Sequence, residues 1–275
     1  MTPGRRGGRA LAWVCAALLA AVAIMAAFGP LVAPGDPNAQ HLLVALTGPS
    51  PTDWLGTDAL GRDVLSRTIV GARTAVIGPA VIALGSMAIG SALGLAAGYS
   101  GGWLDAVVMR GTDVMLALPV LLVAVVVVGI LGGGYALAVG VLTVFYTPQA
   151  IRVVRGAALE QRVLPYVEAA RTLGLSKARI MLRHVWPNTW PLLVANTVLD
   201  FALALVGLAG LSFLGLGVGP KTPDWGRMVG EGRAHLVGNP LAVLAPGVML
   251  VATATSVNLL ADWLYEHVAG RGRAR

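Results

Sequence analysis

Residues that could carry out catalysis are few in this sequence and widely spaced. The four histidines and the single cysteine form neither a CxxC nor an HExxH pattern, so a metal-binding spacing is missing. A GxxxxGK[ST] phosphate-binding loop is missing too, since the nearest approach, from Gly215, has Pro220 in place of the second glycine. We therefore expect a non-catalytic chain that binds no cofactor and no metal itself.

One acid lies within an otherwise apolar stretch. Asp200 follows Pro191 by nine residues, about 13 Å along a helix, which places it well inside a bilayer. Asn196 is four residues earlier and therefore on the same helical face. The pair either lines a pathway for a polar solute or is buried between helices as a neutral, hydrogen-bonded acid. The sequence leaves both interpretations open.

The composition predicts the elements that must position these residues. Strongly apolar residues make up 56% of the 275 positions and charged residues only 12%, against about 25% charged in soluble domains. This excludes a water-soluble enzyme as the first interpretation. The net charge of +7 and the 36 glycines suit close-packed membrane helices better than a nucleic-acid binder. We expect an all-α integral membrane protein.

Charge-free stretches divide the chain into six expected transmembrane helices, because a charge at the bilayer centre costs about 2.5–3.5 kcal/mol. Two of the six share one stretch and are separated by the three glycines at 132–134. In chain order the stretches are Ala10–Val32, Thr74–Leu104, Val114–Ile151 (two helices), Pro191–Gly219 and Ala234–Ala261. The first is too long for a cleaved signal peptide, so we expect it to be retained as an anchor.

The distribution of Lys and Arg predicts the orientation. With six spans and the N-terminus inside, fourteen of the twenty basic residues lie on the cytoplasmic side and six on the other. The positive-inside rule therefore favours two cytoplasmic termini. The second span also carries Gly90, Gly94 and Gly98 on one face, a spacing that suits either packing within the chain or a contact with another subunit.

The longest inner segment encodes two short helices around a glycine corner. Pro165 can begin a helix, Glu168 lies in its first turn, and Gly174 can end it. Ser176 can cap a second helix, which we expect Pro187 to end. Seven basic residues in this segment also suit an alternative, an amphipathic segment lying on lipid headgroups.

The stretch from Glu168 through Ala169 and Ala170 to Gly174, with Pro187 thirteen residues later, resembles the EAA loop of binding-protein-dependent ABC importer permeases. In that family the loop docks in a groove of a cytoplasmic ATPase and passes its closure to the membrane helices. Small alanines permit close docking, and the glycine sets the angle between the helices. His184 and Trp186 replace the usual Ile and Leu before the proline.

Other motifs, in the same order along the chain, are similar to the second-permease type of the dipeptide/oligopeptide/nickel subfamily. They occupy residues 55–67, 71–73, 209–217, 224–226 and 258–262. The resemblance implies a type I ABC importer transmembrane fold with six helices. It further implies an N-terminal helix and extracytoplasmic segment over 1–70, a permease core over 71–265, and a basic cytoplasmic tail over 266–275.

The resemblance also implies partners and a location. The chain would form half of a translocation pathway for dipeptides or oligopeptides, as a heterodimer with a second permease subunit in the bacterial inner membrane. Two cytoplasmic ATPase subunits or domains would bind ATP and Mg, and an extracytoplasmic solute-binding protein would deliver cargo. The chain would also contact membrane lipid, and no nucleic acid is expected as a partner. Alternatives are import of nickel or another small solute, or a self-sufficient secondary carrier, for which only Asp200 supplies a suitable group.

The outer segment after the first span holds a further candidate site. Asp58, Arg62, Asp63 and Arg67 have the spacing of a short helix with ion pairs 58/62 and 63/67. That helix would either be a solvated interfacial element or serve as a docking face for the solute-binding protein. Because an outer loop of about forty residues is longer than a connector needs, the docking face is as well supported as the interfacial element.

Overall fold

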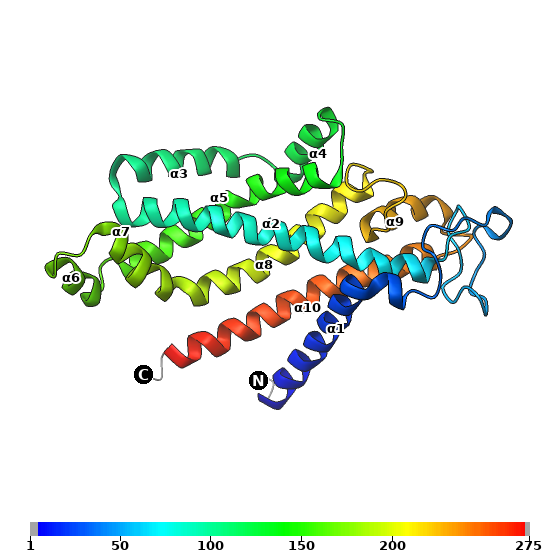
Figure 1. The fold of residues 1–275 in the computed structure, drawn as a ribbon, viewed down its shortest axis with the longest axis horizontal. Coiled ribbons are helices and arrows are strands. Elements are labelled where there is room, and N and C mark those ends of the chain that lie inside the picture. Colours follow the sequence, from blue (N-terminus) through cyan, green and yellow to red (C-terminus); the bar gives the residue numbers. More distant parts are fainter. Residues whose placement is uncertain (1–4, 273–275) are drawn as a thin grey trace. The chain divides into compact units, whose positions relative to one another are not determined.

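The computed structural model describes residues 5–272, with side chains described from 10 to 263. Its described part is built of helices, joined by loops that contain one isolated bridge between Thr57 and Asp63 (Figure 1). The helices are α1 (Arg5–Val32), η1 (Leu42–Val44), α2 (Val64–Ser100), α3 (Gly102–Leu116), α4 (Val120–Ile130), α5 (Tyr135–Gln161), α6 (Pro165–Thr172), α7 (Lys177–Ile180), η2 (Met181–Val185), α8 (Trp186–Phe213), α9 (Trp225–Gly232), η3 (Arg233–His235) and α10 (Leu241–Gly272).

Five stretches of helix are long and apolar enough to cross a membrane, and a bent helix pair can supply a sixth crossing. The five are Ala10–Val32, Val64–Ser100, Tyr135–Gln161, Lys177–Phe213 and Leu241–Trp263. The expected all-α membrane fold is thus confirmed. The first stretch has the bounds expected from sequence, and the turn-forming Pro34 and Gly35 follow shortly after its end.

Several spans are longer than the charge-free stretches that predicted them. α2 begins ten residues before Thr74 and takes in Arg67 and Arg73, while α5 continues ten residues past Ile151. At 37 residues α2 extends for about 55 Å, well beyond a hydrocarbon core of about 30 Å. Charged residues therefore end the apolar part of a helix in this protein without ending the helix.

The third crossing differs most from expectation. Instead of one straight helix after Val114, the structure has α3 and α4, between which the chain bends by 83°. Ala117, Leu118 and Pro119 form the break. Pro119 has no N–H to continue the ladder, and its ring disfavours helical geometry at the residue before it, so the helix ends there.

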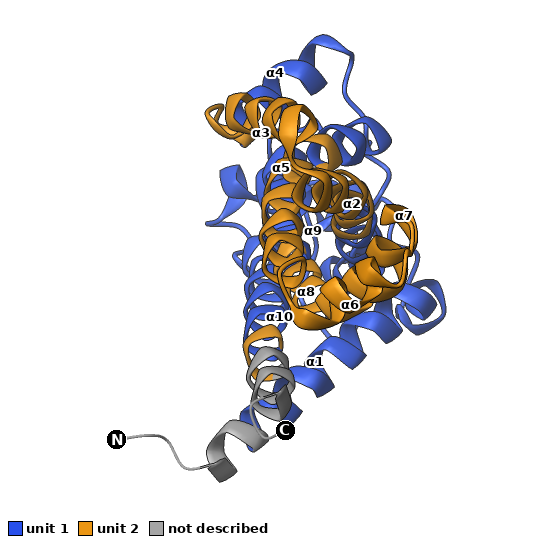
Figure 2. Cartoon of the chain, turned by 90° about the vertical axis from the view of Figure 1, so that its left-hand side faces the viewer, with its two compact units in different colours: residues 1–81, 121–142, 201–260 blue, residues 82–120, 143–200, 261–275 orange. Residues whose placement is uncertain are grey.

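The chain divides into two compact units (Figure 2). The second unit comprises residues 82–120, 143–200 and 261–275. Its core joins the later part of α2 and α5 with α6 and the start of α8, and includes Val154, Val167, Ile180 and Val185. The segment around the glycine corner is therefore anchored in the core of this unit by its own apolar side chains.

The glycines of α2 explain how close α5 comes within this unit. A Cβ added at Gly90 would lie 2.5 Å from the Cβ of Ala150, and one at Gly94 would lie 2.7 Å from the carbonyl oxygen of Ile151. A Cβ added at Gly98 would lie 2.8 Å from the carbonyl oxygen of Arg155. The glycine spacing therefore serves packing within the chain, one of the two interpretations left open above.

The first unit comprises residues 1–81, 121–142 and 201–260. Trp225 of α9 is fully buried in its core, beside Val22, Ala72 and Leu205. The indole Nε1 of Trp225 donates a 2.7 Å hydrogen bond to the carbonyl of Thr68. This contact holds α9 against the first turns of α2. The candidate residues Asp58 to Arg67 lie just before and within these turns.

Candidate functional sites

The first candidate site is the corner formed by α6 and α7. α6 begins with Pro165 at its first position, and Glu168 lies in its first turn as the sequence predicted. Val167 and Ala170 are buried, whereas Glu168 and Ala169 are exposed. The short helix thus presents an acid and a small residue outward while its other face holds it to the unit.

Gly174 ends α6 in the way that its position predicted. It has φ of +74°, its N–H donates to the carbonyl of Arg171 (2.9 Å), and the N–H of Leu175 donates to the carbonyl of Ala170 (3.2 Å). These two bonds are those of a Schellman motif, which satisfies the last carbonyls of a helix. A Cβ at Gly174 would meet no atom within 4 Å, so the requirement for glycine is conformational rather than steric.

The second helix departs from expectation at Pro187. Ser176 caps α7 through a 3.4 Å bond from the N–H of Arg179, as expected. The helix then continues through the π turn η2 into α8, so Pro187 does not end it. The proline is tolerated because it is the second residue of α8, next to a turn whose wider i→i−5 bond runs from the N–H of Trp186 to the carbonyl of Met181.

An open pocket of about 370 Å³ lies beside α6. It is lined by Tyr99, Arg162, Val163, Glu168 and Arg171. The Arg171 guanidinium lies 5.5 Å above the Tyr99 ring, a cation–π arrangement, and Arg162 donates to the carbonyl of Gly98. The exposed acid of α6 is thus flanked by two arginines.

The second candidate site is a network of charges in the first unit. Asp58 accepts a 2.6 Å bond from Nε of Arg62, whose Nη2 is 2.9 Å from Glu231 of α9. Arg67 is fully buried; its Nε lies 3.5 Å from Asp58 and its Nη1 donates to the carbonyl of Pro37. Because Arg62 and Arg67 are 4% and 0% exposed, they bind segments of the chain together rather than face solvent.

The short helix expected over Asp58–Arg67 is not formed. Only the 58/62 ion pair occurs as expected, and it closes a non-helical turn. Asp63 does not pair with Arg67: its carboxylate accepts the backbone N–H groups of Leu65 and Ser66. Asp63 therefore caps the start of α2, a position in which aspartate satisfies donors that a helix leaves free.

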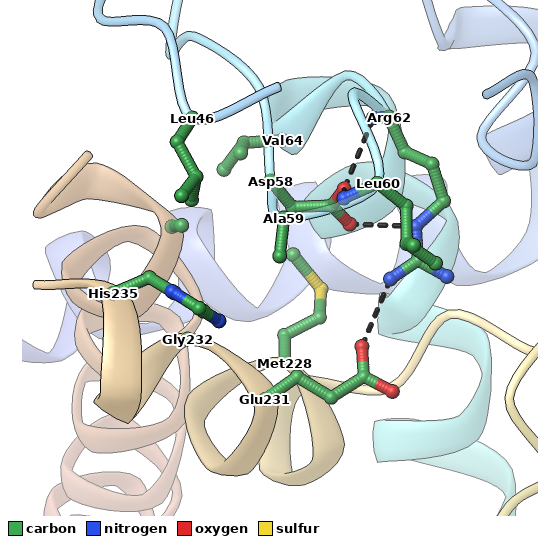
Figure 3. A pocket seen from close by; sticks show the side chains of 11 residues that line it. Leu46, Asp58, Ala59, Leu60, Arg62, Val64, Met228, Glu231, Gly232 and His235 are labelled. Atoms are coloured by element: carbon green, nitrogen blue, oxygen red, sulfur yellow. Dashed lines mark hydrogen bonds and ion pairs between the residues drawn. The ribbon is translucent and has the colours of Figure 1, made fainter. Parts of the chain in front are cut away.

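A cavity of about 290 Å³ lies beside this network (Figure 3). Leu46, Val64 and Met228 give it an apolar lining, and the ion pairs of Arg62 form one wall. His235 points into it from the other side. The cavity thus combines an apolar lining with one charged wall.

Asp224 is a buried acid in the loop before α9. It is 5% exposed, and its carboxylate accepts the N–H of Arg227 at 3.0 Å, which makes it the N-cap of α9. Burial disfavours the ionised form and raises the pKa of Asp224, while the hydrogen bonds that it accepts oppose this in part.

The acid inside the fifth span has the partner that the sequence suggested. The side-chain amide of Asn196 donates a 2.8 Å hydrogen bond to Asp200, a residue that is 5% exposed. The two residues share one face of α8, as their spacing predicted.

Sequence reasoning missed other contacts of the second unit. Asp105 of α3 forms a bidentate ion pair with Arg155 of α5, and Asp113 pairs with Arg152 at 2.6 Å. The sequence did contain a signal for these ion pairs, because the acids and the arginines all lie near the ends of apolar stretches. Tyr166, which contacts both sides of the corner, carried no comparable signal.

The protein has several apolar helices of membrane-spanning length, and its loops contain networks of ion pairs. These features define a multi-pass membrane protein. Residues 90–273 match the family described as binding-protein-dependent transport system inner membrane component. The chain therefore belongs to this family of ABC importer permeases, which confirms the resemblance.

Individual relatives place it in the dipeptide/oligopeptide group. It is 39% identical over 217 residues to the glutathione transport system permease protein GsiD of Pectobacterium atrosepticum, covering 79% of this chain and 72% of that protein. It is 32% identical over 254 residues to the dipeptide transport system permease protein DppC of Alkalihalophilus pseudofirmus, covering 92% and 84%.

Proposed function

We propose that this chain forms half of the translocation pathway of an ATP-driven importer and imports small peptides. Its pathway partner is a second, different permease subunit, and an extracytoplasmic solute-binding protein delivers the cargo. Two cytoplasmic ATPase subunits or domains bind ATP and Mg and hydrolyse the ATP. The membership of the family supports the subunit role, and the names of the glutathione and dipeptide relatives support a peptide cargo.

The coupling contact of this proposal is the loop from Glu168 to Pro187. The observation that supports it best is the corner itself: a Schellman turn at Gly174 presents exposed Glu168 and Ala169, while Val167 and Ala170 anchor the same helix in a core. Such a helix can pass force to the membrane helices, because one face is free to bind and the other is packed.

The proposal includes a topology. Both termini and the Glu168–Pro187 loop lie in the cytoplasm of a bacterium, the segment from Asp58 to Arg73 lies outside the inner membrane, and fourteen of twenty basic residues are then inside. With this orientation the Asp58, Arg62, Asp63 and Arg67 segment is on the side from which the solute-binding protein approaches.

Reconstitution tests the proposed function. In proteoliposomes that contain this chain, the second permease, the ATPase subunits and the solute-binding protein, we expect uptake of a dipeptide or of glutathione that requires ATP. Liposomes with this chain alone should show neither uptake nor ATP hydrolysis. Uptake by the chain alone, driven by an ion gradient, would instead support a secondary carrier, and uptake of nickel by the whole assembly would change the cargo.

A further inference from the structure

One tyrosine of the corner contacts the ends of two long helices at once. The hydroxyl of Tyr166, on α6, lies 2.5 Å from the side-chain oxygen of Gln161, the last residue of α5. The same hydroxyl lies 3.3 Å from the carbonyl oxygen of His184, in the π turn that leads into α8. All three residues lie within the second unit, where the Tyr166 ring packs against the core.

An asparagine completes this junction from the side of α8. The amide of Asn188 donates a 2.6 Å hydrogen bond to the His184 carbonyl and lies 3.4 Å from the Tyr166 hydroxyl. The His184 carbonyl is therefore within reach of two side-chain donors, one on α8 and one on α6. Tyr166 thus lies between the start of one span and the end of another.

The turn that carries His184 departs from the regular α-helix. Pro187 lacks an N–H and its ring clashes with the carbonyl four residues earlier, so the regular ladder is interrupted here. Residues 181–185 take the wider π form instead. Single π turns within α-helices occur frequently at functional sites, and they are places where a helix kinks.

A phenol has one proton to donate, so Tyr166 can make only one strong donated bond at a time. The 2.5 Å distance shows that Gln161 is the acceptor in this structure, and the longer distance leaves His184 as a second acceptor. A carbonyl oxygen has two lone pairs and can accept more than one donor, and the Asn188 amide already donates to this one. A small movement of α6 can thus exchange one acceptor for the other without leaving the hydroxyl unpaired.

We propose that Tyr166 is a positioning residue for energy coupling, whose hydroxyl exchanges its donated hydrogen bond between Gln161 and the His184 carbonyl as α6 moves. In one state α6 is tied to α5, and in the other it is tied to the π turn at the head of α8. This role rests on the proposed function of the corner, and it supplies the two discrete arrangements that coupling between distant sites requires.

The test is a double-mutant cycle in the whole reconstituted assembly. Tyr166→Phe removes the hydroxyl and keeps the ring, and Gln161→Met removes one acceptor at similar side-chain size. The measured quantity is dipeptide imported per ATP hydrolysed. Each variant should lower this ratio by about fivefold, the size of one hydrogen bond, and the double variant should be no worse than either single variant.

Thr189→Val is the matched control. It removes a hydroxyl that donates to the carbonyl of Trp186 at 2.7 Å, next to the same turn but within α8. It should keep the wild-type ratio. A wild-type ratio in Tyr166→Phe, or losses that simply add in the double variant, would overturn the role proposed for Tyr166.

Hydrogen exchange supplies a readout that does not depend on transport. With the chain alone in lipid nanodiscs, Tyr166→Phe should speed amide exchange in residues 162–170 by about fivefold, because the bond from Tyr166 to Gln161 ties α6 to the end of α5, and Thr189→Val should not. Unchanged exchange in Tyr166→Phe would show that the hydroxyl does not hold α6 to α5. If the wild-type assembly itself imports nothing with ATP, the proposed function fails; if it imports normally and Tyr166→Phe does too, only this inference fails.

Discussion

Replacing Gly174 by valine tests how far coupling depends on the corner. Gly174 has φ of +74°, a conformation that a β-branched residue adopts at a cost of about 1–3 kcal/mol. Since an added Cβ meets no atom within 4 Å, this cost arises from the backbone conformation and not from a clash at Cβ. At about 1.4 kcal/mol for a factor of ten, the population of the native corner falls by about 5- to 150-fold relative to other conformers.

The assay is the rate of ATP hydrolysis against the concentration of loaded solute-binding protein, in proteoliposomes that contain the whole assembly. Gly174→Val should insert normally and lose most of the stimulation of ATPase activity by the binding protein, together with uptake. Glu168→Lys should have the same effect by a different route, because Glu168 is exposed and its reversal alters a docking face without disturbing the core.

Gly174→Asn is the matched control, because asparagine tolerates positive φ far better than valine. It should keep most of the stimulation. The reasoning would be refuted if the valine variant were stimulated like wild type, or if the asparagine and valine variants lost stimulation equally, since the loss would then not come from backbone conformation.

Three further predictions follow from the topology, the helix packing and the buried acid. In intact spheroplasts an impermeant thiol reagent should modify a cysteine at Ala59 and spare one at Thr172; the reverse pattern would invert the topology. Gly94→Ala should lower the stability in detergent by about 1–3 kcal/mol, because the added methyl group meets the backbone of α5. Gly111→Ala is the control and should have no such effect, because an added Cβ there meets no atom within 4 Å. Equal effects of the two substitutions would argue against the close approach of α2 and α5. Burial raises the pKa of Asp224, so the unfolded chain loses this proton at a lower pH than the folded chain, and the free energy of unfolding should fall as pH rises above about 4. Asp224→Asn keeps the cap of α9 and should remove this part of the pH dependence. An identical dependence of stability on pH in both proteins would contradict this prediction.

Local sequence signals predicted the parts of the corner that local physics determines. Pro165, Gly174 and Ser176 each act through their own backbone, and the structure has a helix start, a positive φ and a cap at these residues. Pro187 misled the prediction because its cost depends on the turn before it. The π turn accommodates the ring, and a rule about single residues does not foresee this.

Contacts between distant segments were harder to predict. Asp58 and Arg62 are four residues apart and were paired correctly, but Arg62 also binds Glu231, which is 169 residues away. Asp63 was expected to pair with Arg67 but caps α2 instead, and only the place where α2 begins decides between the two. The role of Tyr166 depends on three segments meeting, which no spacing within one segment indicates.

Cross-linking tests the central claim most directly, namely that α6 docks on an ATPase subunit. A cysteine is placed at Ala169, which is exposed, or at Ala170, which is 4% exposed, in a chain whose single native Cys15 has been replaced. In membranes that contain the whole assembly, a short thiol-to-amine cross-linker should join the Ala169 variant to an ATPase subunit and leave the Ala170 variant unlinked. An Ala169 variant that inserts and supports uptake, yet links to lipid or to no ATPase subunit with or without ATP, would contradict the account.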